Sequence, residues 1–392
     1  MPINIKEEVA KLESELIELR RDFHQHPEIG LQEKRTAGIV ADRLKELGLE
    51  VQTEIGQTGV VGLLKGNSEG KTLMLRADMD ALPIQEENEV DYRSKNDGVM
   101  HACGHDGHTA ILLTVARILA EHREEIKGNI KFVFQPGEEG QNGAQLMIND
   151  GVLKSPEIDG VLGLHLWGTS PVGQIGVRVG ATMASADVFT IRILGKSGHG
   201  AHPEGGVDAI YIAGNVITSL QSLISREVSA QEPLVLHIGT IKGGNAGNII
   251  ADRVTMRASV RTLNEDLRAT IHDRLDRIIG GIASAHRGSH ELIHHGGIAS
   301  VMNDPAMVDL VVAEAEKVVG ADNITSPLPT MGSDDMARFL EAAPGCYFFV
   351  GTENQDKGIT YPHHHSQYNI DEKALAIGTE TLTRAALSYF NA

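Results

Sequence analysis

Apolar residues at steps of three and four positions predict helices toward both ends of the chain. Near the N-terminus, one helical face is formed by five apolar residues: Val9, Leu12, Leu16, Leu19 and Phe23. A second helix is expected over residues 32–47, where Gly48 follows it. Further helices are expected at these segments: 109–126, 304–319 and 372–390.

Short apolar runs between these helices predict buried strands. These runs cover residues 59–66, 72–80, 129–136, 160–168 and 346–352. The run TLMLRADMD at 72–80 has few polar interruptions, as in a sheet that is buried on both faces. The alternation of strands and helices predicts an α/β sandwich.

The pattern changes near Met183, where apolar and polar residues begin to alternate. This alternation predicts strands with one solvated face at 186–195, 234–243 and 253–263. Two helices are expected between and after them, at 206–224 and 265–285. Together these segments predict a small α+β domain, with two helices on a four-stranded antiparallel sheet.

We therefore expect two domains, one inserted into the other. The larger domain is discontinuous and comprises residues 1–183 and 300–392, and the inserted domain spans 184–299. A length of 392 residues agrees with two domains, because a single core seldom grows that large.

Composition narrows the classes of protein that the chain can represent. The hydrophobic fraction of 41% and the charged fraction of 22% are typical of a soluble globular protein. A net charge of −18 argues against nucleic acid as a partner, and no apolar run approaches the roughly 20 residues that cross a bilayer. The two cysteines exclude a disulfide framework, and the N-terminus has no signal-peptide pattern. We expect a cytoplasmic protein with no membrane partner.

Residues that bind metals collect where the predicted strands end. Glu138 and Glu139 follow one strand, His165 ends another, and Asp78 and Asp80 follow a third. The segment MHACGHDGHT at 100–109 precedes a helix, and three consecutive histidines stand at 363–365. Because ligands gather beyond the carboxyl ends of strands in α/β sheets, we expect these side chains to converge. Thiolate, imidazole and carboxylate groups together suit a divalent transition metal.

Each of these residues also has an ordinary explanation. Cys103 can be a buried core cysteine or a nucleophile activated by a histidine, and His165 can be a core histidine with its hydrogen bonds satisfied. A thiol among imidazoles and carboxylates binds metal readily, which disfavours the nucleophile. The adjacent pair Glu138 and Glu139 suits hydrolysis, with one carboxylate as a metal ligand and the other as a proton acceptor.

The motifs resemble those of the amidohydrolase branch of the aminoacylase and glutamate-carboxypeptidase metallopeptidases. That branch includes hippurate hydrolases, indole-acetyl-amino-acid hydrolases and N-acyl-amino-acid deacylases. The resemblance extends from DFHQHPEIG to YNIDEKAL, and it is strongest in eight segments: RADMDALP, MHACGHDGHT, FQPGEEG, GLHLW, GKSGHGAHP, GNIIAD, MGSDDMA and HHHSQYNIDE. It implies a zinc-peptidase-like α/β catalytic domain with an inserted lid or dimerisation domain.

The resemblance implies a centre with two metal ions. Its ligands would be Cys103 in the bridging place, His105, Glu139 and His165. The last ligand would be the histidine eight places before Glu372, which is His364, although its neighbours His363 and His365 leave this choice open. The family usually has a proline two residues after this histidine, where this chain has Ser366.

Other residues around the centre receive supporting roles. Glu138 matches the general base of the family, and Asp80 is expected to orient a metal-binding imidazole. His101 and His108 are expected to lie behind the ligands or at the helix start. Asp106 is expected to cap the helix that follows it.

The inserted domain carries further matches. His199 in GKSGHGAHP resembles the histidine that stabilises the transition state, and in dimeric relatives this histidine reaches the neighbouring subunit's site. Asn248 and Arg261 resemble residues that contact the substrate carboxylate. Gly332 and Ser333 resemble a turn that lines the substrate pocket.

The function implied is hydrolysis of the amide bond of a small N-acyl amino acid, with two divalent ions per subunit. Zinc or manganese fits these ligands best, and nickel or cobalt shares the ligand types. We expect a homodimer or homotetramer formed through the inserted domain. Two alternatives stay open: a carboxypeptidase or dipeptidase that cleaves short peptides, and a catalytically weak protein whose metals hold a ligand-binding cleft.

Overall fold

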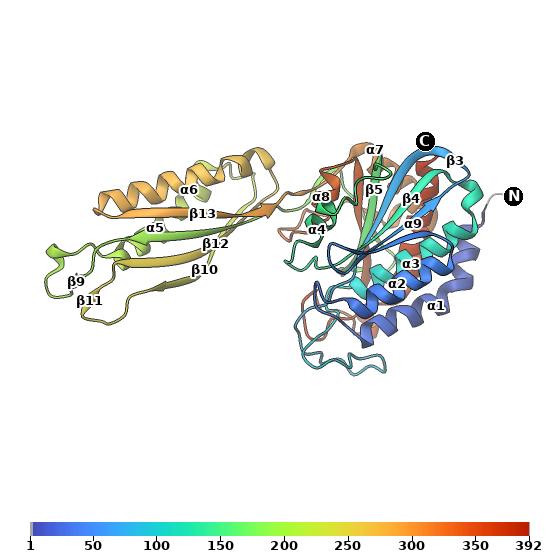
Figure 1. Cartoon of the computed structure of the whole chain (residues 1–392), viewed down its shortest axis with the longest axis horizontal. Coiled ribbons are helices and arrows are strands. Elements are labelled where there is room, and N and C mark those ends of the chain that lie inside the picture. The colour runs from blue at the N-terminus through green and yellow to red at the C-terminus, as the bar shows by residue number, and fades with distance from the viewer. Residues whose placement is uncertain (1–2, 392) are drawn as a thin grey trace. The chain divides into compact units, whose positions relative to one another are not determined.

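The computed structural model describes residues 3–391 of the chain (Figure 1). The chain divides into two compact units. Unit 1 comprises Met1–Gly180, Met302–Leu328 and Asp334–Ala392, and unit 2 comprises Ala181–Val301 and Pro329–Ser333. The second unit thus includes a short segment that lies outside the expected insertion at 184–299.

Unit 1 is built on an eight-stranded mixed sheet with the strand order β1-β2-β4-β3-β5-β16-β6-β15. Its strands are β1 (Glu50–Ile55), β2 (Gly59–Lys65), β3 (Ser68–Asp78), β4 (Lys127–Gln135), β5 (Gly160–Pro171), β6 (Ile175–Gly176), β15 (Ile324–Thr325) and β16 (Gly345–Glu353). The central strands β4, β3, β5 and β16 pair in parallel, so their carboxyl ends lie at one edge. The predicted strands are all present.

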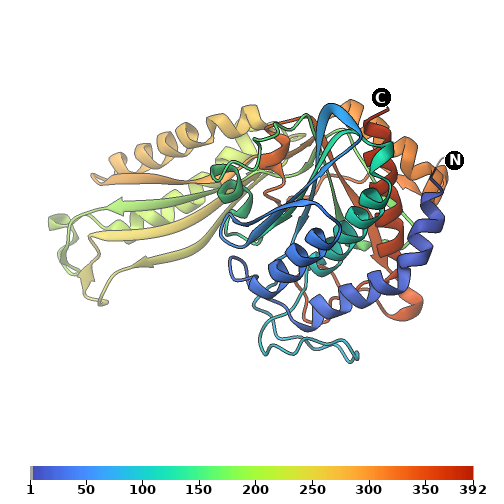
Figure 2. The same ribbon diagram turned by 45° about the vertical axis from the view of Figure 1, so that its right-hand side comes forward.

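Helices pack against this sheet. They are α1 (Ile5–Gln25), α2 (Lys34–Glu46), α3 (His105–Glu121), α4 (Gly143–Asn149), α7 (Pro305–Val319), α8 (Ala337–Leu340) and α9 (Lys373–Tyr389). Helix α3 contacts β3, β4 and β5, and α9 contacts β5 and β16, while α1 packs on both helices. The blue and teal helices α1, α2 and α3 lie together along one side of the sheet (Figure 2). The predicted α/β sandwich is confirmed.

The two faces of β3 differ in chemistry although both are buried. Leu73 and Leu75 belong to the hydrophobic core that α3 and α9 cover. Arg76 and Asp78 alternate with that apolar row, and both side chains are inaccessible to solvent. The strand is therefore buried on both faces, as its apolar run predicts, but one face holds charge.

The long connection at 79–104 joins β3 to α3 and contains no helix. His24 of α1 links it to the start of α3, because its Nδ1 donates to Asp106 (2.7 Å) and its Nε2 donates to Glu86 (3.1 Å). The expectation that Asp106 caps α3 is wrong. The helix begins at His105 with Gly104 as its N-cap, and the Asp106 carboxylate instead accepts from His24 and from Arg20 (2.8 Å).

Unit 2 contains a four-stranded antiparallel sheet with the order β10-β12-β8-β13. Its main elements are β8 (Ala186–Leu194), α5 (Ala209–Ser222), β10 (Leu234–Gly243), β12 (Arg253–Thr262), α6 (Glu265–Ala285) and β13 (Ser289–Ile298). Four short strands lie outside this sheet. Strands β9 (Gly198–His199) and β11 (Ile249–Ile250) belong to unit 2, while β7 (Gly180–Met183) and β14 (Val301–Asn303) stand where the chain passes between the units. The predicted α+β arrangement of four strands and two helices is confirmed. Among residues 3–391, no helix is long and apolar enough to cross a membrane.

Candidate metal centre

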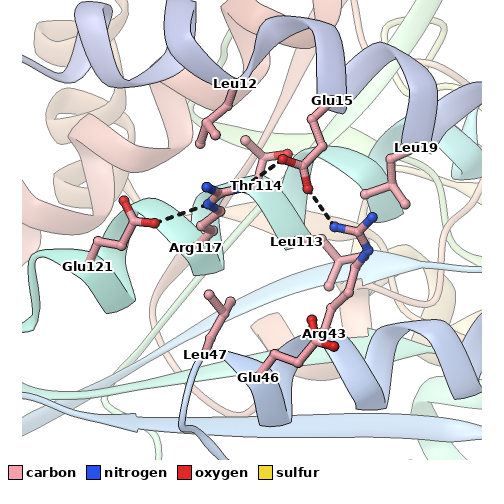
Figure 3. Close-up of a pocket in the computed structure, with 10 residues that line it drawn as sticks. All are labelled: Leu12, Glu15, Leu19, Arg43, Glu46, Leu47, Leu113, Thr114, Arg117 and Glu121. Atoms are coloured by element: carbon pink, nitrogen blue, oxygen red, sulfur yellow. Dashed lines mark hydrogen bonds and ion pairs between the residues drawn. The ribbon is translucent and has the colours of Figure 1, made fainter.

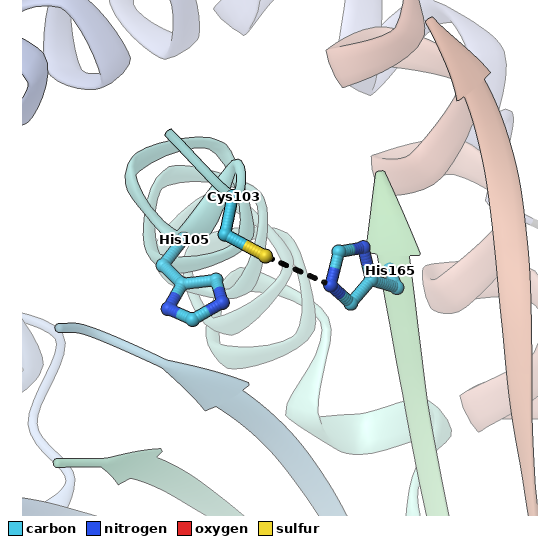
Figure 4. Close-up of side chains that lie close together, drawn as sticks. All are labelled: Cys103, His105 and His165. Carbon is cyan, nitrogen blue, oxygen red and sulfur yellow. Dashed lines mark hydrogen bonds between the residues drawn. The ribbon is translucent and has the colours of Figure 1, made fainter. Parts of the chain in front are cut away.

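The side chains that the sequence nominates as metal ligands converge in unit 1. Ligand atoms of Cys103, His105 and His165 lie within 4.8 Å of one another, and so do those of Cys103, Glu139 and His364. Figure 4 shows Cys103 and His105 at the start of α3, with the Cys103 sulfur directed at His165 on β5. Cys103 is the member that both groups share, which is the place that the family resemblance implies for it.

A left-handed turn brings Cys103 and His105 together. Gly104 between them has φ +95° and acts as the N-cap of α3. A Cβ on Gly104 would come within 3.0 Å of the Tyr368 hydroxyl, so both the backbone angle and the available space require glycine. The turn lets residues on both sides of Gly104 face the same point.

Hydrogen bonds at the far ring nitrogens orient the two buried imidazoles. His105 donates from Nδ1 to the backbone oxygen of Asp80 (2.9 Å) and to its carboxylate (3.1 Å). His165 donates from Nδ1 to the Leu166 carbonyl oxygen (2.8 Å) and places Nε2 3.6 Å from Cys103 Sγ. Metal-binding histidines commonly donate from the second ring nitrogen in this way. Asp80 therefore lies where the sequence predicts it.

The last ligand is one of three consecutive histidines, and their contacts differ. His364 places Nε2 3.0 Å from Glu139 Oε1. His363 donates to the Leu166 carbonyl oxygen (2.9 Å), and His365 accepts from the Gln367 backbone N–H (3.0 Å). Of the three, only His364 joins a ligand group among the residues that the structure describes.

The donor set fits a divalent cation. His105 Nε2 is buried and has no hydrogen-bond partner among residues 3–391. Burial and the nearby His108 lower the pKa of His165 well below its ordinary value, so this ring is neutral, as a metal ligand must be. Burial raises the pKa of the Cys103 thiol, and a cation beside the sulfur would counter that effect by stabilising the thiolate.

Glu138 stands beside the ligands on the turn that follows β4. One of its carboxylate oxygens lies within 4.8 Å of ligand atoms of His105 and Glu139. Burial, and then the neighbouring Asp334 carboxylate, raise the pKa of Glu138 well above its ordinary value. A raised pKa favours the protonated form of a carboxyl group, so such a group can hold a proton and later release it.

A buried ion-pair network lies behind Glu138. Arg76 bonds to Asp78 (2.8 Å), Asp334 (3.2 Å) and Asp335 (3.3 Å), and the Tyr347 hydroxyl donates to Asp334 (2.8 Å). Sequence reasoning did not single out Arg76, Asp334 or Asp335. The signal available was the charged pair in MGSDDMA together with an arginine inside an apolar strand.

Asp78 and His108 connect this network to neighbouring elements. His108 donates from Nδ1 to Asp78 (2.6 Å) and accepts at Nε2 from the Leu166 backbone N–H (2.9 Å). Both ring nitrogens are therefore satisfied by β3 and β5. His108 thus lies behind the ligand cluster, as the sequence predicts. His101 is buried in the same region.

The nominated residues of unit 2 fall into two separate groups. His199 pairs with Ile249, and the Asn248 carbonyl accepts from the Gly200 backbone N–H (2.9 Å). These residues lie beyond the end of the sheet at which Arg253 pairs with Leu194.

Arg261 stands eight residues after Arg253 on β12, so the two lie about 26 Å apart at the rise of an extended strand. Its guanidinium donates to the Met331 carbonyl oxygen (2.9 Å) and to Ser333 Oγ (3.3 Å). Gly332 lies between those partners, and its carbonyl accepts from the Ala184 N–H (2.8 Å). Within unit 2, Arg261, Gly332 and Ser333 therefore form one group, and His199 and Asn248 form another.

A pocket of about 280 Å³ lies elsewhere in unit 1, among α1, α2 and α3 (Figure 3). Both of its arginines are paired within the lining, because Glu15 bonds to Arg43 (2.7 Å) and Arg117 (2.6 Å). None of the residues nominated from the sequence lines it. The chemistry of the chain is therefore concentrated at the ligand cluster and not in this pocket.

Comparison with known proteins agrees with this geometry. Residues 74–388 match the model of peptidase family M20/M25/M40. An N-acyl-L-amino acid amidohydrolase of Geobacillus stearothermophilus is 44% identical over 76% of this chain and 80% of its own length. Thermostable carboxypeptidase 2 of Saccharolobus solfataricus is 37% identical over 99% and 98% of the two chains. Among solved structures, a dinuclear metal binding peptidase of Bacillus subtilis superposes with a TM-score of 0.86 at 33% identity, over 97% of this chain and 99% of the other. The chain therefore belongs to peptidase family M20/M25/M40.

Proposed function

We propose that this protein hydrolyses the amide bond of small N-acyl amino acids and releases a carboxylic acid and a free amino acid. The observation that carries this proposal is the place of Glu138, a half-buried carboxylate beside the ligand groups that is adjacent to the ligand candidate Glu139. The 44% identical relative is named for the same reaction class. The reaction needs an activated water and a proton acceptor within reach, and the cluster offers residues for both tasks.

Five side chains would hold two divalent cations: Cys103, His105, His165, Glu139 and His364. When bound, such ions polarise a carbonyl oxygen and lower the pKa of a water. Zinc or manganese suits the mixed thiolate, imidazole and carboxylate donors, and nickel or cobalt shares these ligand types.

Glu138 carries the proton transfers in this proposal. Its carboxylate accepts a proton from the attacking water and then gives that proton to the departing amine. The role is supported by burial, by the neighbouring Asp334 and by the raised pKa of Glu138. Asp80 keeps His105 in a fixed orientation while this happens.

Residues of unit 2 supply the remaining contacts. We infer that His199 donates to the developing oxyanion and that Asn248 and Arg261 bind the substrate carboxylate, with Gly332 and Ser333 lining the pocket. His199 and Asn248 lie at the opposite end of β12 from Arg261, so one subunit does not bring all five to one small molecule within unit 2. A second copy of the chain that presents His199 and Asn248 resolves this separation.

The surface of unit 2 supports such a dimer. Helix α5 (AIYIAGNVITSLQS) has no charged residue, and its Ile210 and Tyr211 are 49% and 58% exposed. Helix α6 of the same unit instead exposes charged side chains such as Asp273 and Arg277. Strand β10, which α5 contacts, is an edge of the sheet with unpaired backbone groups. We infer that a second copy of the chain covers α5 and β10.

Peptide cleavage is the second candidate function. Thermostable carboxypeptidase 2, at 37% identity, favours it, because the same residues can hydrolyse a peptide bond as well as an acyl-amide bond. A catalytically weak binding protein is the third, although the chain keeps both Glu138 and His199. A cytoplasmic location stays a prediction from the sequence.

Substitution of Glu138 tests the proposed reaction. We expect Glu138→Gln to lower kcat about 10²–10⁴-fold, because the amide cannot accept the proton, while the metal content stays unchanged. The assay compares acetyl-, benzoyl- and aminoacyl-amino acids, and fastest turnover of the aminoacyl series would favour the peptidase alternative. Glu157→Gln, at an exposed glutamate of unit 1, is the matched control. Near wild-type turnover by metal-loaded Glu138→Gln would refute the assignment of the base.

The two cysteines provide a paired test of the metal centre. Cys103→Ala removes the donor that both ligand groups share, so we expect the metal content per chain to fall by roughly half or more. Cys346→Ala removes a thiol in the hydrophobic core and is expected to leave the metal content unchanged. Elemental analysis after gel filtration measures both variants. Equal metal content in the two proteins contradicts the proposed ligand set.

A charge on α5 tests the proposed dimer. We expect Tyr211→Lys to raise the dissociation constant at least about tenfold, because a buried unpaired ammonium is costly at an interface. Thr270→Lys, on the exposed face of α6, is the control and should leave the oligomeric state unchanged. Light scattering over a dilution series reports both. A fully active monomer of the wild-type chain would overturn the role of His199 across subunits.

A further inference from the structure

The turn that carries Glu138 is held on both sides by buried carboxylates. On one side, Asp80 Oδ2 accepts from the Glu139 backbone N–H (2.9 Å). On the other side, Glu33 Oε1 accepts from the Gly137 backbone N–H (2.8 Å). Glu138 therefore stands between two backbone groups whose positions are set by side chains from other elements.

Glu33 is committed to this turn. The residue is 0% exposed, and the Thr58 hydroxyl donates to its second oxygen, Oε2 (2.5 Å). Glu33 immediately precedes α2, where a side chain commonly caps the helix, but it makes no capping hydrogen bond. Its carboxylate instead accepts hydrogen bonds from Gly137, in the turn after β4, and from Thr58.

The turn has little freedom to compensate for a lost bond. Gly137 has φ +56°, and a Cβ there would come within 3.0 Å of Gln141 Cβ and of Leu31 Cδ2. Gly143 also donates its backbone N–H to the Gly137 carbonyl oxygen (3.0 Å). The backbone before Glu138 is thus packed tightly, and Glu33 supplies the side-chain acceptor for the Gly137 N–H.

We propose that Glu33 is a positioning residue for Glu138, acting through the Gly137 N–H to fix the carboxylate of the base relative to the ligand cluster. The proposal rests on the proposed function, in which Glu138 transfers the proton. Asp80 also accepts from the candidate ligand His105, whereas Glu33 accepts from Gly137 and Thr58 and from none of the candidate ligands. Because a displacement of about 1 Å in a catalytic group can cost about 10²-fold in rate, the effect falls on kcat and not on KM.

Three variants at Glu33 test the inference by steady-state kinetics on the metal-loaded protein. Glu33→Leu removes the acceptor and is expected to lower kcat about 30–100-fold, with KM within about threefold and metal content unchanged. Glu33→Asp keeps the charge but withdraws it from Gly137, so we expect an intermediate loss of about tenfold in a variant that preserves the fold. Glu33→Gln keeps an oxygen for the Gly137 N–H and should restore kcat to within about threefold.

Thr58→Val is the matched control, because it removes the other hydrogen bond of Glu33 and leaves the Gly137 bond in place. We expect its kcat to stay within about threefold of wild type. Glu33→Gln removes the negative charge but keeps an acceptor for the Gly137 N–H, so a near wild-type kcat in that variant would assign the effect to the hydrogen bond and not to the charge.

A double-variant cycle separates positioning from general damage. If Glu33 acts through Glu138, adding Glu33→Leu to Glu138→Gln should lower the residual kcat by less than about twofold. The inference is overturned if Glu33→Leu and Glu33→Asp keep wild-type kcat, or if activity falls only in proportion to lost metal. It is also overturned if Glu33→Gln or Thr58→Val is as impaired as Glu33→Leu, or if the double variant shows the full additional loss. Near wild-type turnover of Glu138→Gln would instead overturn the proposed function itself.

Discussion

Hydrogen bonds at the far ring nitrogens of His105 and His165 decide where the donor atoms of the centre point. His105 donates from Nδ1 to the carbonyl and carboxylate oxygens of Asp80, and His165 donates from Nδ1 to the Leu166 carbonyl oxygen. Each ring then directs Nε2 toward Cys103. Those acceptors belong to the segment after β3 and to β5, which are fixed because the two strands pair in parallel. The pairing of these strands therefore sets the geometry of the centre.

Several carboxylates gather at the same edge of the sheet, and the buried guanidinium of Arg76 stabilises their negative charge. Arg76 faces Asp78, Asp334 and Asp335 in a region closed to solvent, where unpaired carboxylates would be costly. Even so, burial raises the pKa of Asp335 to about 7, and it raises the pKa of Glu138 well above its ordinary value. The fold thus supplies a protonatable carboxyl group next to the candidate metal ligands, which is what the proposed hydrolysis requires.

The sequence predicts much of the fold because its patterns are local. Periodicity locates α6 at Glu265–Ala285 and three strands of the unit 2 sheet, β8, β10 and β12, but it does not locate β13. The expectation that Asp106 caps α3 is wrong, because its carboxylate bonds to Arg20, a residue distant in the chain. Pattern alone does not distinguish His364 from His363 and His365, since their roles depend on contacts with Glu139, β5 and Gln367.

Longer-range relations were beyond the reach of the sequence for the same reason. The separation of His199 from Arg261 follows from strand register, and the bond from Gly137 to Glu33 joins residues 104 positions apart. Neither leaves a periodic signal. Residues that act through backbone hydrogen bonds, as we infer for Glu33, become visible only when the partner turn is placed in space.

The central claim is that one cysteine serves two metal ions at the end of this sheet. Crystals of the protein loaded with manganese or zinc, measured at the absorption edge of that metal, test it most directly by anomalous scattering. We predict two anomalous peaks per chain that share Cys103 Sγ, one also bound by His105 and His165 and the other by Glu139 and His364. A single peak, or two peaks that leave Cys103 unbound, would contradict the account.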